Sequence, residues 1–168
     1  MDFDAAWWIR ELNLTRHIEG GSFRETYRSP IILDQQVIGK NFKASRAIST
    51  SIYFLLEKGQ FSAFHKIASD ETWHFYEGDP LDIFEFTPEG ELITHKLGRD
   101  PSKGQSFQVL IPGGRWFGSR VADNGSYSLV GCTVAPGFDF ADFELGDRAK
   151  LTELYPAHKT LIAEMTYK

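Results

Sequence analysis

Two short runs of residues, in which apolar side chains alternate with other types, place the strongest constraint on the fold. They lie within Gly59–Gly78, on either side of a turn-like Ala68-Ser69-Asp70 segment. The residues that share one face are Phe61, Ala63, His65 and Ile67 in the first run, and Glu71, Trp73 and Phe75 in the second. A period of two residues is typical of β-strands. A hairpin at the turn is therefore expected to bring His65 and Glu71 to the same side of one sheet.

His65 and Glu71 are the first candidates for a functional site. A buried imidazole and a buried carboxylate are costly unless each has a partner, so the two side chains either satisfy each other inside a core or form a site. Their matching position across a short turn favours a site. In that arrangement Glu71 orients the imidazole, and His65 takes or gives a proton near neutral pH.

The rest of the chain predicts an all-β sandwich or barrel with helical ends. About eight short strands follow one another with turn sequences between them, and the later ones are expected at residues 81–86, 91–97, 105–111, 115–121 and 127–134. A short helix is expected after Asp4, and two more at residues 147–154 and 156–165. We expect one domain over residues 1–168, with the barrel at about 14–145 and a helical tail at 146–168.

Composition narrows the class of partner. The net charge is −5 and no basic patch follows the chain, so nucleic acid is not expected as a partner. The acidic start Met1-Asp2-Phe3-Asp4 is unlike a secretion signal, and no apolar run is long enough to span a bilayer. Cys132 is the single cysteine, which excludes an intrachain disulfide and permits a reducing compartment. A cytoplasmic protein without membrane contact is expected.

The strand predicted at residues 48–57 carries apolar side chains on both faces. Ile52, Phe54 and Leu56 alternate with Tyr53 and Leu55. Such a strand is covered on both sides. In a barrel of this size the outer cover is a terminal helix or a second subunit, and we expect a homodimer.

The segment Gly59–Gly78 also resembles the first signature motif of the cupins, G-x5-H-x-H-x(3 or 4)-E-x6-G. Four of its five fixed positions are present, as Gly59, His65, Glu71 and Gly78, and Ile67 stands in place of the second histidine. This resemblance implies a double-stranded β-helix, the cupin jelly-roll barrel, with a pocket in its mouth.

The resemblance bears on metal binding as well. Residues 112–117 are similar to the second cupin motif, P-x-G-x-x-H, but Phe117 takes the position of its histidine. In metal-binding cupins two histidines and the glutamate of the first motif join this histidine, so two of the four ligands are missing here. A divalent metal normally takes three or more protein ligands. No metal and no cofactor are therefore expected. The alternative is a metal-dependent oxygenase in which His65, Glu71 and an unforeseen third ligand hold iron or manganese.

Residues 19–28 resemble the N-terminal strand, R-G-x-F-x-E-x-W, of the dTDP-sugar epimerase branch of cupins. In that branch the histidine at the position of His65 is the base that takes a proton next to a ketone. The resemblance implies the same role for His65, with a late-loop carboxylate, Asp139 or Asp142, as its support. The branch has phosphate-binding arginines where this chain has Gly20 and Ser62, and its tyrosine falls at Gly131-Cys132.

Residues 14–145 as a whole resemble a cupin branch catalogued as a domain of unknown function. The chain carries near-complete versions of its features E-G-G-x-F-R-E-T-Y, T-x-I-Y-F-L-L and H-K-x-x-S-D-E-x-W-H-F-Y-x-G. This resemblance implies a fold and a family but no activity. It leaves open an isomerase-like or epimerase-like enzyme and a binding module without chemistry.

Four further residues are candidates for contact with a small polar or anionic metabolite. Arg115 has the same parity as Phe117, and a buried arginine requires a carboxylate or an anionic ligand. Its partner is expected to be Glu71, Glu25 or the ligand. The candidates are Arg115, Trp73, Glu25 and Phe117. For Trp73 a core position is favoured over a stacking platform, and His17, His74, His95 and His158 receive no role.

Overall fold

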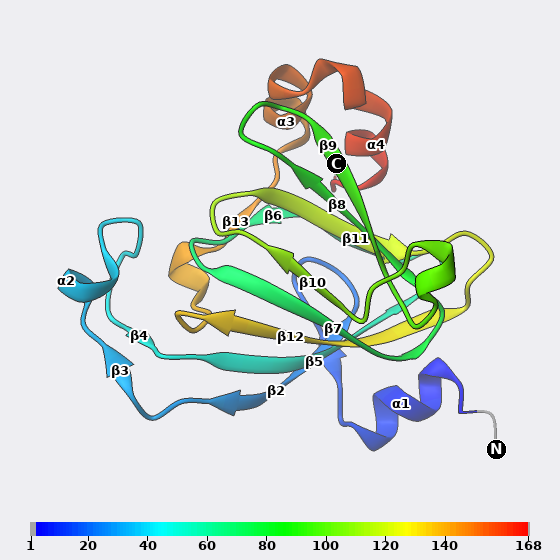
Figure 1. Cartoon of the computed structure of the whole chain (residues 1–168), viewed down its shortest axis with the longest axis horizontal. Helices are drawn as coiled ribbons and strands as arrows, with labels where there is room; N and C mark the ends of the chain where they lie inside the picture. Colours follow the sequence, from blue (N-terminus) through cyan, green and yellow to red (C-terminus); the bar gives the residue numbers. More distant parts are fainter. Residues whose placement is uncertain (1–2, 168) are drawn as a thin grey trace.

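Two antiparallel sheets pack face to face in the computed structural model, which describes residues 3–167 and leaves Met1, Asp2 and Lys168 outside the description (Figure 1). The six-stranded sheet contains, in spatial order, β1 (Thr15–Arg16), β2 (Ser22–Arg28), β5 (Thr50–Glu57), β12 (Tyr127–Ala135), β7 (Asp70–Gly78) and β10 (Gln108–Ile111). The five-stranded sheet contains β13 (Glu144–Leu145), β6 (Phe61–Lys66), β11 (Trp116–Val121), β8 (Leu81–Phe86) and β9 (Leu92–Leu97).

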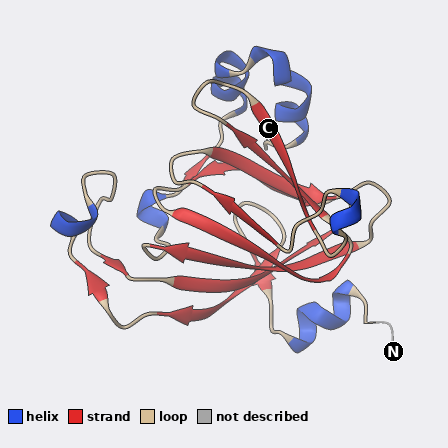
Figure 2. Cartoon of the chain, in the orientation of Figure 1, coloured by secondary structure: helices blue, strands red, loops and turns tan. Residues whose placement is uncertain are grey.

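The longer α-helices lie near the two ends of the chain (Figure 2). They are α1 (Ala5–Glu11), α3 (Arg148–Leu154) and α4 (Lys159–Glu164), and 3₁₀ turns occur at Pro101–Lys103, Phe140–Asp142 and Pro156–His158. The Asp4 carboxylate caps α1 by accepting the N–H of Trp7 at 2.8 Å. The prediction of an all-β sandwich or barrel with helical ends is confirmed, in the form of two packed sheets.

The expected hairpin between β6 and β7 is wrong. β6 pairs with β11 and β13 in the five-stranded sheet, whereas β7 pairs with β12 and β10 in the six-stranded sheet. Apolar alternation fixes which side of a strand is buried, but it is the same whether two strands pair or face each other. His65 and Glu71 consequently approach the interior from opposite sheets.

The main core fills the space between the sheets, and smaller clusters cover their outer faces. α3 and α4 pack on the outer face of the five-stranded sheet through Leu151, Ile162 and Met165. On the outer face of the six-stranded sheet, α1 packs beside Leu55 and Leu129. The two-sided burial expected for the strand at 50–57 is thus met, and α1 provides the outer cover.

A small arm projects from the six-stranded sheet, at the left of Figure 1. It consists of β3 (Ile32–Leu33) paired with β4 (Arg46–Ala47) and the single-turn helix α2 (Gln35–Ile38) between them. The polar sequence here predicts a loop or an irregular hairpin, and the short paired strands agree with the hairpin. Among the residues described, none of the helices is long and apolar enough to cross a membrane.

Candidate functional site

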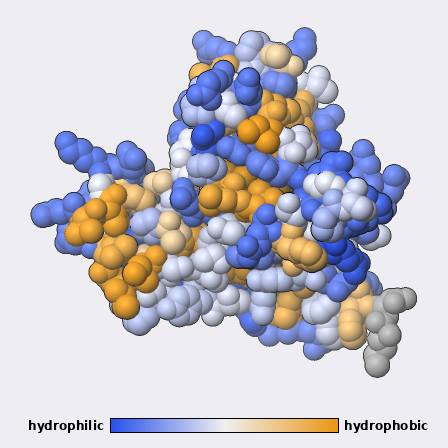
Figure 3. Space-filling view, viewed as in Figure 1, coloured by the Kyte–Doolittle hydropathy of each residue, from blue (hydrophilic) through white to orange (hydrophobic). Residues whose placement is uncertain are grey.

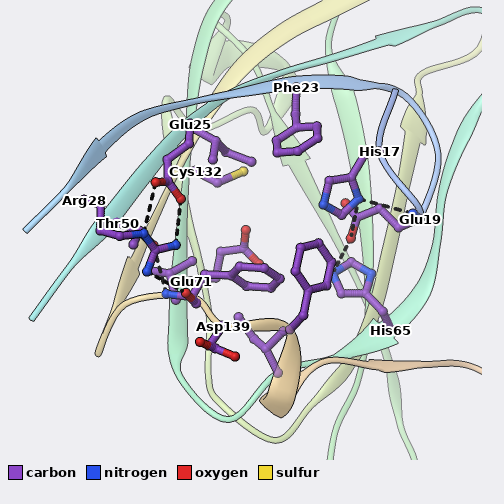
Figure 4. Close-up of a pocket in the computed structure, with 15 residues that line it drawn as sticks. His17, Glu19, Phe23, Glu25, Arg28, Thr50, His65, Glu71, Cys132 and Asp139 are labelled. Carbon is purple, nitrogen blue, oxygen red and sulfur yellow. Dashed lines mark hydrogen bonds and ion pairs between the residues drawn. The ribbon is translucent and has the colours of Figure 1, made fainter. Parts of the chain in front are cut away.

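A cavity of about 230 Å³ lies between the two sheets, and its lining includes Arg28 and Thr50, at the ends of β2 and β5 from which the arm projects. Its walls come from β2, β5, β6, β7 and β12, from the connection between β1 and β2, and from the loop at residues 138–140. Figure 4 shows Glu25 and Arg28 at one end of the cavity and His17, Glu19 and His65 at the other.

Three of the six predicted site residues line this cavity, namely His65, Glu71 and Glu25. Trp73 and Phe117 do not line it, because both are fully buried in the core between the sheets. Trp73 packs edge-on against Phe117 and against Phe54. Trp73 thus occupies the core position that the sequence favours for it, whereas the predicted contact of Phe117 with a ligand is not met in this cavity.

Arg115 also lies outside the cavity lining. Its Nη1 is 3.4 Å from Oε1 of the buried Glu85, whose Oε2 is 2.8 Å from Nε2 of His95. Glu85, and neither Glu71 nor Glu25, is thus its carboxylate partner. Strand parity does not extend to Arg115, because β11 begins only at Trp116 and the preceding Gly114 has a positive φ of 80°.

His65 is held by hydrogen-bonding groups at both ring nitrogens. Nδ1 is 2.7 Å from the carbonyl oxygen of Ala63, and since a carbonyl only accepts, Nδ1 carries a proton. Nε2 is 3.2 Å from Oε2 of Glu19. Without a proton between them two lone pairs face each other, so Nε2 and Oε2 share one proton.

Glu19 is the carboxylate partner of His65, and the sequence does not reveal it. The sequence favours Glu71 for this role, and the family resemblance implies Asp139 or Asp142. The main chain places Glu19 beside His65, because the Glu19 carbonyl accepts the N–H of Ala63 at 2.7 Å. Gly20 permits this approach, since its φ is 115° and a Cβ there collides with the carbonyl of Phe61.

Burial sets the protonation of the His65–Glu19 pair. It raises the pKa of Glu19, against the attraction of His17 and a hydrogen bond from Ser62 Oγ at 2.9 Å. It lowers the pKa of His65, against the attraction of Glu71 and the Ala63 carbonyl. Both directions favour the uncharged form of the pair, with the shared proton on the carboxyl group.

Glu71 faces the same cavity from the opposite sheet and is almost fully buried. Burial raises its pKa to about 7; the charge of Glu19 adds to this, and the attraction of His65 and a hydrogen bond with Cys132 oppose it. Glu71 is therefore close to half ionised near neutral pH. A carboxyl group that is half ionised can accept or donate a proton.

Arg28 and Glu25 form a bidentate pair at the other end of the cavity. Arg28 Nε and Nη2 donate to the two oxygens of Glu25 at 3.0 and 2.7 Å, and Nη1 donates to the carbonyl of Phe138 at 3.1 Å. The hydrogen bonds to the Glu25 carboxylate raise the pKa of Arg28 further above its ordinary range. The guanidinium thus links β2 to the loop that closes the cavity.

The cavity residues do not fit a divalent metal. Two expected ligand positions hold the buried apolar side chains Ile67 and Phe117, and both nitrogens of His65 already have partners. Within residues 3–167, no three His, Cys, Asp or Glu side chains are grouped in a way that could hold a metal ion.

Comparisons with known proteins agree with this architecture. The family model described as Cupin superfamily (DUF985) matches residues 6–146. An uncharacterised protein of Saccharomyces cerevisiae is 31% identical over 143 residues, which cover 80% of this chain and 71% of the yeast protein.

Solved structures are similar over almost the whole chain. A protein from Shewanella oneidensis is 41% identical with a TM-score of 0.88 and covers 99% of both chains. A hypothetical protein from Leishmania major is 37% identical with a TM-score of 0.89, covering 98% of this chain and 99% of its own. Oxalate decarboxylase from Bacillus subtilis, at 13% identity and a TM-score of 0.54, covers 89% of this chain and 36% of its own, and shares the fold alone.

Proposed function

The chain belongs to the DUF985 branch of the cupin superfamily, and from this premise we propose that it transfers protons on a small molecule bound in the cavity, without a metal ion. The observation that carries the proposal is the pair of proton-carrying groups facing one cavity from opposite sheets. Glu71 lies on β7, and the His65–Glu19 pair lies on β6 and the β1–β2 connection.

The protonation states of the two groups are complementary. Glu71, with a pKa of about 7, supplies a carboxylate that can take a proton near neutral pH. The His65–Glu19 pair holds one proton that it can give. His65 thus keeps the proton-transfer role expected from the sequence, but with Glu19 as the carboxylate that orients it. An acceptor and a donor on opposite sides of a substrate suit an isomerase or an epimerase.

The cavity supports a small metabolite as the substrate. A volume of about 230 Å³ corresponds to roughly eight water molecules. Phe23, Phe138 and Phe140 give it aromatic walls, and a few polar groups converge between them. Arg28, in place of Arg115, is the guanidinium that can meet an anionic substituent.

Solvent deuterium exchange tests this proposal. A panel of small sugars, hydroxy acids and oxo acids is incubated with the protein in D₂O, and NMR reports deuterium at the carbon next to the carbonyl. We expect incorporation with the wild type and a loss of about 10²–10⁴-fold in His65→Ala and Glu71→Gln. His74→Ala is the control, because His74 bonds to Thr133 and Gln108 and does not line the cavity. Binding without any exchange in the wild type contradicts the proposal.

A binding module without chemistry is the second candidate. It is favoured by the fact that both ring nitrogens of His65 already have partners within the protein. It predicts that a panel compound binds tightly, that binding survives His65→Gln, and that no product or exchange appears.

A further inference from the structure

His17 is a cavity residue to which neither the sequence nor the proposed function gives a role. It follows β1 directly, and its side chain is only 8% exposed. The ring lies edge-on to Phe23, with centroids 4.5 Å apart, and stacks on Phe140 at 6.1 Å. These aromatic contacts fix the orientation of the imidazole at the cavity wall.

The main chain determines which nitrogen of His17 carries the proton. The N–H of Glu19 donates to Nδ1 at 3.2 Å, so Nδ1 holds a lone pair. The neutral ring therefore carries its proton on Nε2. Nε2 has no hydrogen-bond partner within residues 3–167, and Figure 4 shows the unbonded ring nitrogen turned into the cavity.

The surroundings keep this ring uncharged. Burial lowers the pKa of His17, attraction to Glu19 opposes the shift, and the charge of His65 adds to it. A neutral imidazole N–H is a hydrogen-bond donor that does not readily give up its proton. Such a donor, held in place before the reaction, stabilises negative charge that develops on an oxygen atom.

We propose that His17 Nε2–H donates a hydrogen bond to the carbonyl oxygen of the substrate, which makes small aldehydes, ketones and oxo acids with a neighbouring C–H the ligand class. This inference rests on the proposed function and adds the group that stabilises its intermediate. Glu71 takes the proton of the C–H bond, the electron pair of that bond forms C=C, and the π pair of C=O moves to oxygen. His17 holds the resulting enolate oxygen.

The reaction is completed by the groups already described. The π pair of C=C then takes the proton of the His65–Glu19 pair at the same carbon from the opposite side, while an oxygen lone pair re-forms C=O. The two transfers together invert the configuration at that carbon. Glu71 then loses its proton to solvent and the His65–Glu19 pair regains one, which restores the starting state without any oxidant or reductant.

NMR of the imidazole nitrogens tests the assignment without relying on turnover. In ¹⁵N-labelled protein at neutral pH we expect His17 to be the neutral tautomer with its proton on Nε2. Acetohydroxamate, a small planar mimic of an enolate, is the probe, and its binding is expected to shift the Nε2–H resonances of His17 and not those of His74. A ring protonated on Nδ1, or no shift with the probe bound, overturns the inference.

Two substitutions separate a hydrogen-bond donor from a packing role. His17→Phe keeps an aromatic ring but removes the donor, and we expect the exchange kcat to fall about 10²–10³-fold with little change in KM. His17→Gln retains an N–H donor and is expected to recover part of that loss. Wild-type exchange kinetics in folded His17→Phe contradicts the inference and leaves the proposed function intact. If the wild type exchanges nothing, the proposed function fails, and the NMR experiment still decides the position of the proton. The NMR experiment also decides the position of the proton if His17→Phe does not fold.

Discussion

Glu71 links the site to the stability of the whole chain, because its pKa is raised from 4.5 to about 7 by burial. The folded protein binds this proton more tightly than the unfolded chain does. The resulting stability is fully present below about pH 4.5 and is lost as the pH rises through about 7.

We therefore predict that Glu71→Gln removes one component of the pH dependence. Between about pH 4.5 and pH 8 the wild type should lose about 2–4 kcal/mol of unfolding free energy relative to the variant. Urea denaturation of both proteins across this range measures the difference. Parallel curves for the two proteins show that Glu71 titrates normally and contradict the prediction.

At the scale of single residues, the sequence predicted His65 and Glu71 as cavity residues but did not find Glu19 or His17. Strand parity applies to His65 and Glu71 because both lie inside strands. Glu19 and His17 lie in an irregular connection, where the direction of a side chain depends on the Gly20-Gly21 turn. The E-G-G sequence was the available signal, since two adjacent glycines indicate close approach of the backbone to another segment.

At the scale of elements, the loop that follows β12 closes one side of the cavity. The N–H of Phe138 donates to Thr50 Oγ1 at 2.9 Å, and its carbonyl accepts from Arg28. Asp142, at the far end of the loop, accepts from Arg46 Nε of β4 at 2.6 Å. Both members of this ion pair are buried, so the base of the arm is fastened to the cavity loop.

We predict that Asp142→Ala costs about 3–5 kcal/mol of unfolding free energy, because it leaves the Arg46 charge buried without its carboxylate. The double variant Arg46→Met/Asp142→Leu should recover most of this loss. Chemical denaturation of the wild type, Arg46→Met, Asp142→Leu and the double variant gives the coupling energy. Glu164→Gln, which breaks the exposed Arg120–Glu164 pair, is the control and should cost less than about 1 kcal/mol. A small loss in Asp142→Ala argues against a buried ion pair here.

The elements themselves were more predictable than their pairing. Short runs between turn sequences predict strands at residues 81–86 and 127–134, and β8 and β12 occupy them to within one residue. The pairing partner of each strand is harder to predict, because a period of two residues carries no information about the neighbouring strand. The assumed hairpin at Ala68-Ser69-Asp70 failed for this reason, although it placed His65 and Glu71 on the correct, buried faces.

At the scale of the whole molecule, exposed apolar side chains gather on the arm. Figure 3 shows them as an orange patch on the projecting part at the left. The exposed apolar residues of the arm and its base are Tyr27, Ile31, Ile32, Val37 and Ile48, among which Ile32 is 61% and Val37 77% exposed. A patch of this kind on a projecting hairpin is typical of an interaction surface.

We predict that a second copy of this chain covers the arm. The interface of the expected homodimer then lies on the arm and not on the outer face of β5. The short sheet of β3 and β4 has open edges that can pair with another strand, and burial of the apolar patch adds about 25 cal/mol per Å². Sedimentation velocity should show a dimer for the wild type and a monomer for Ile32→Glu/Val37→Glu. Leu154→Glu, at an exposed apolar position on α3 away from the arm, is the control and should remain dimeric. A monomeric wild type, or a dimer that survives both arm substitutions, contradicts this role for the arm.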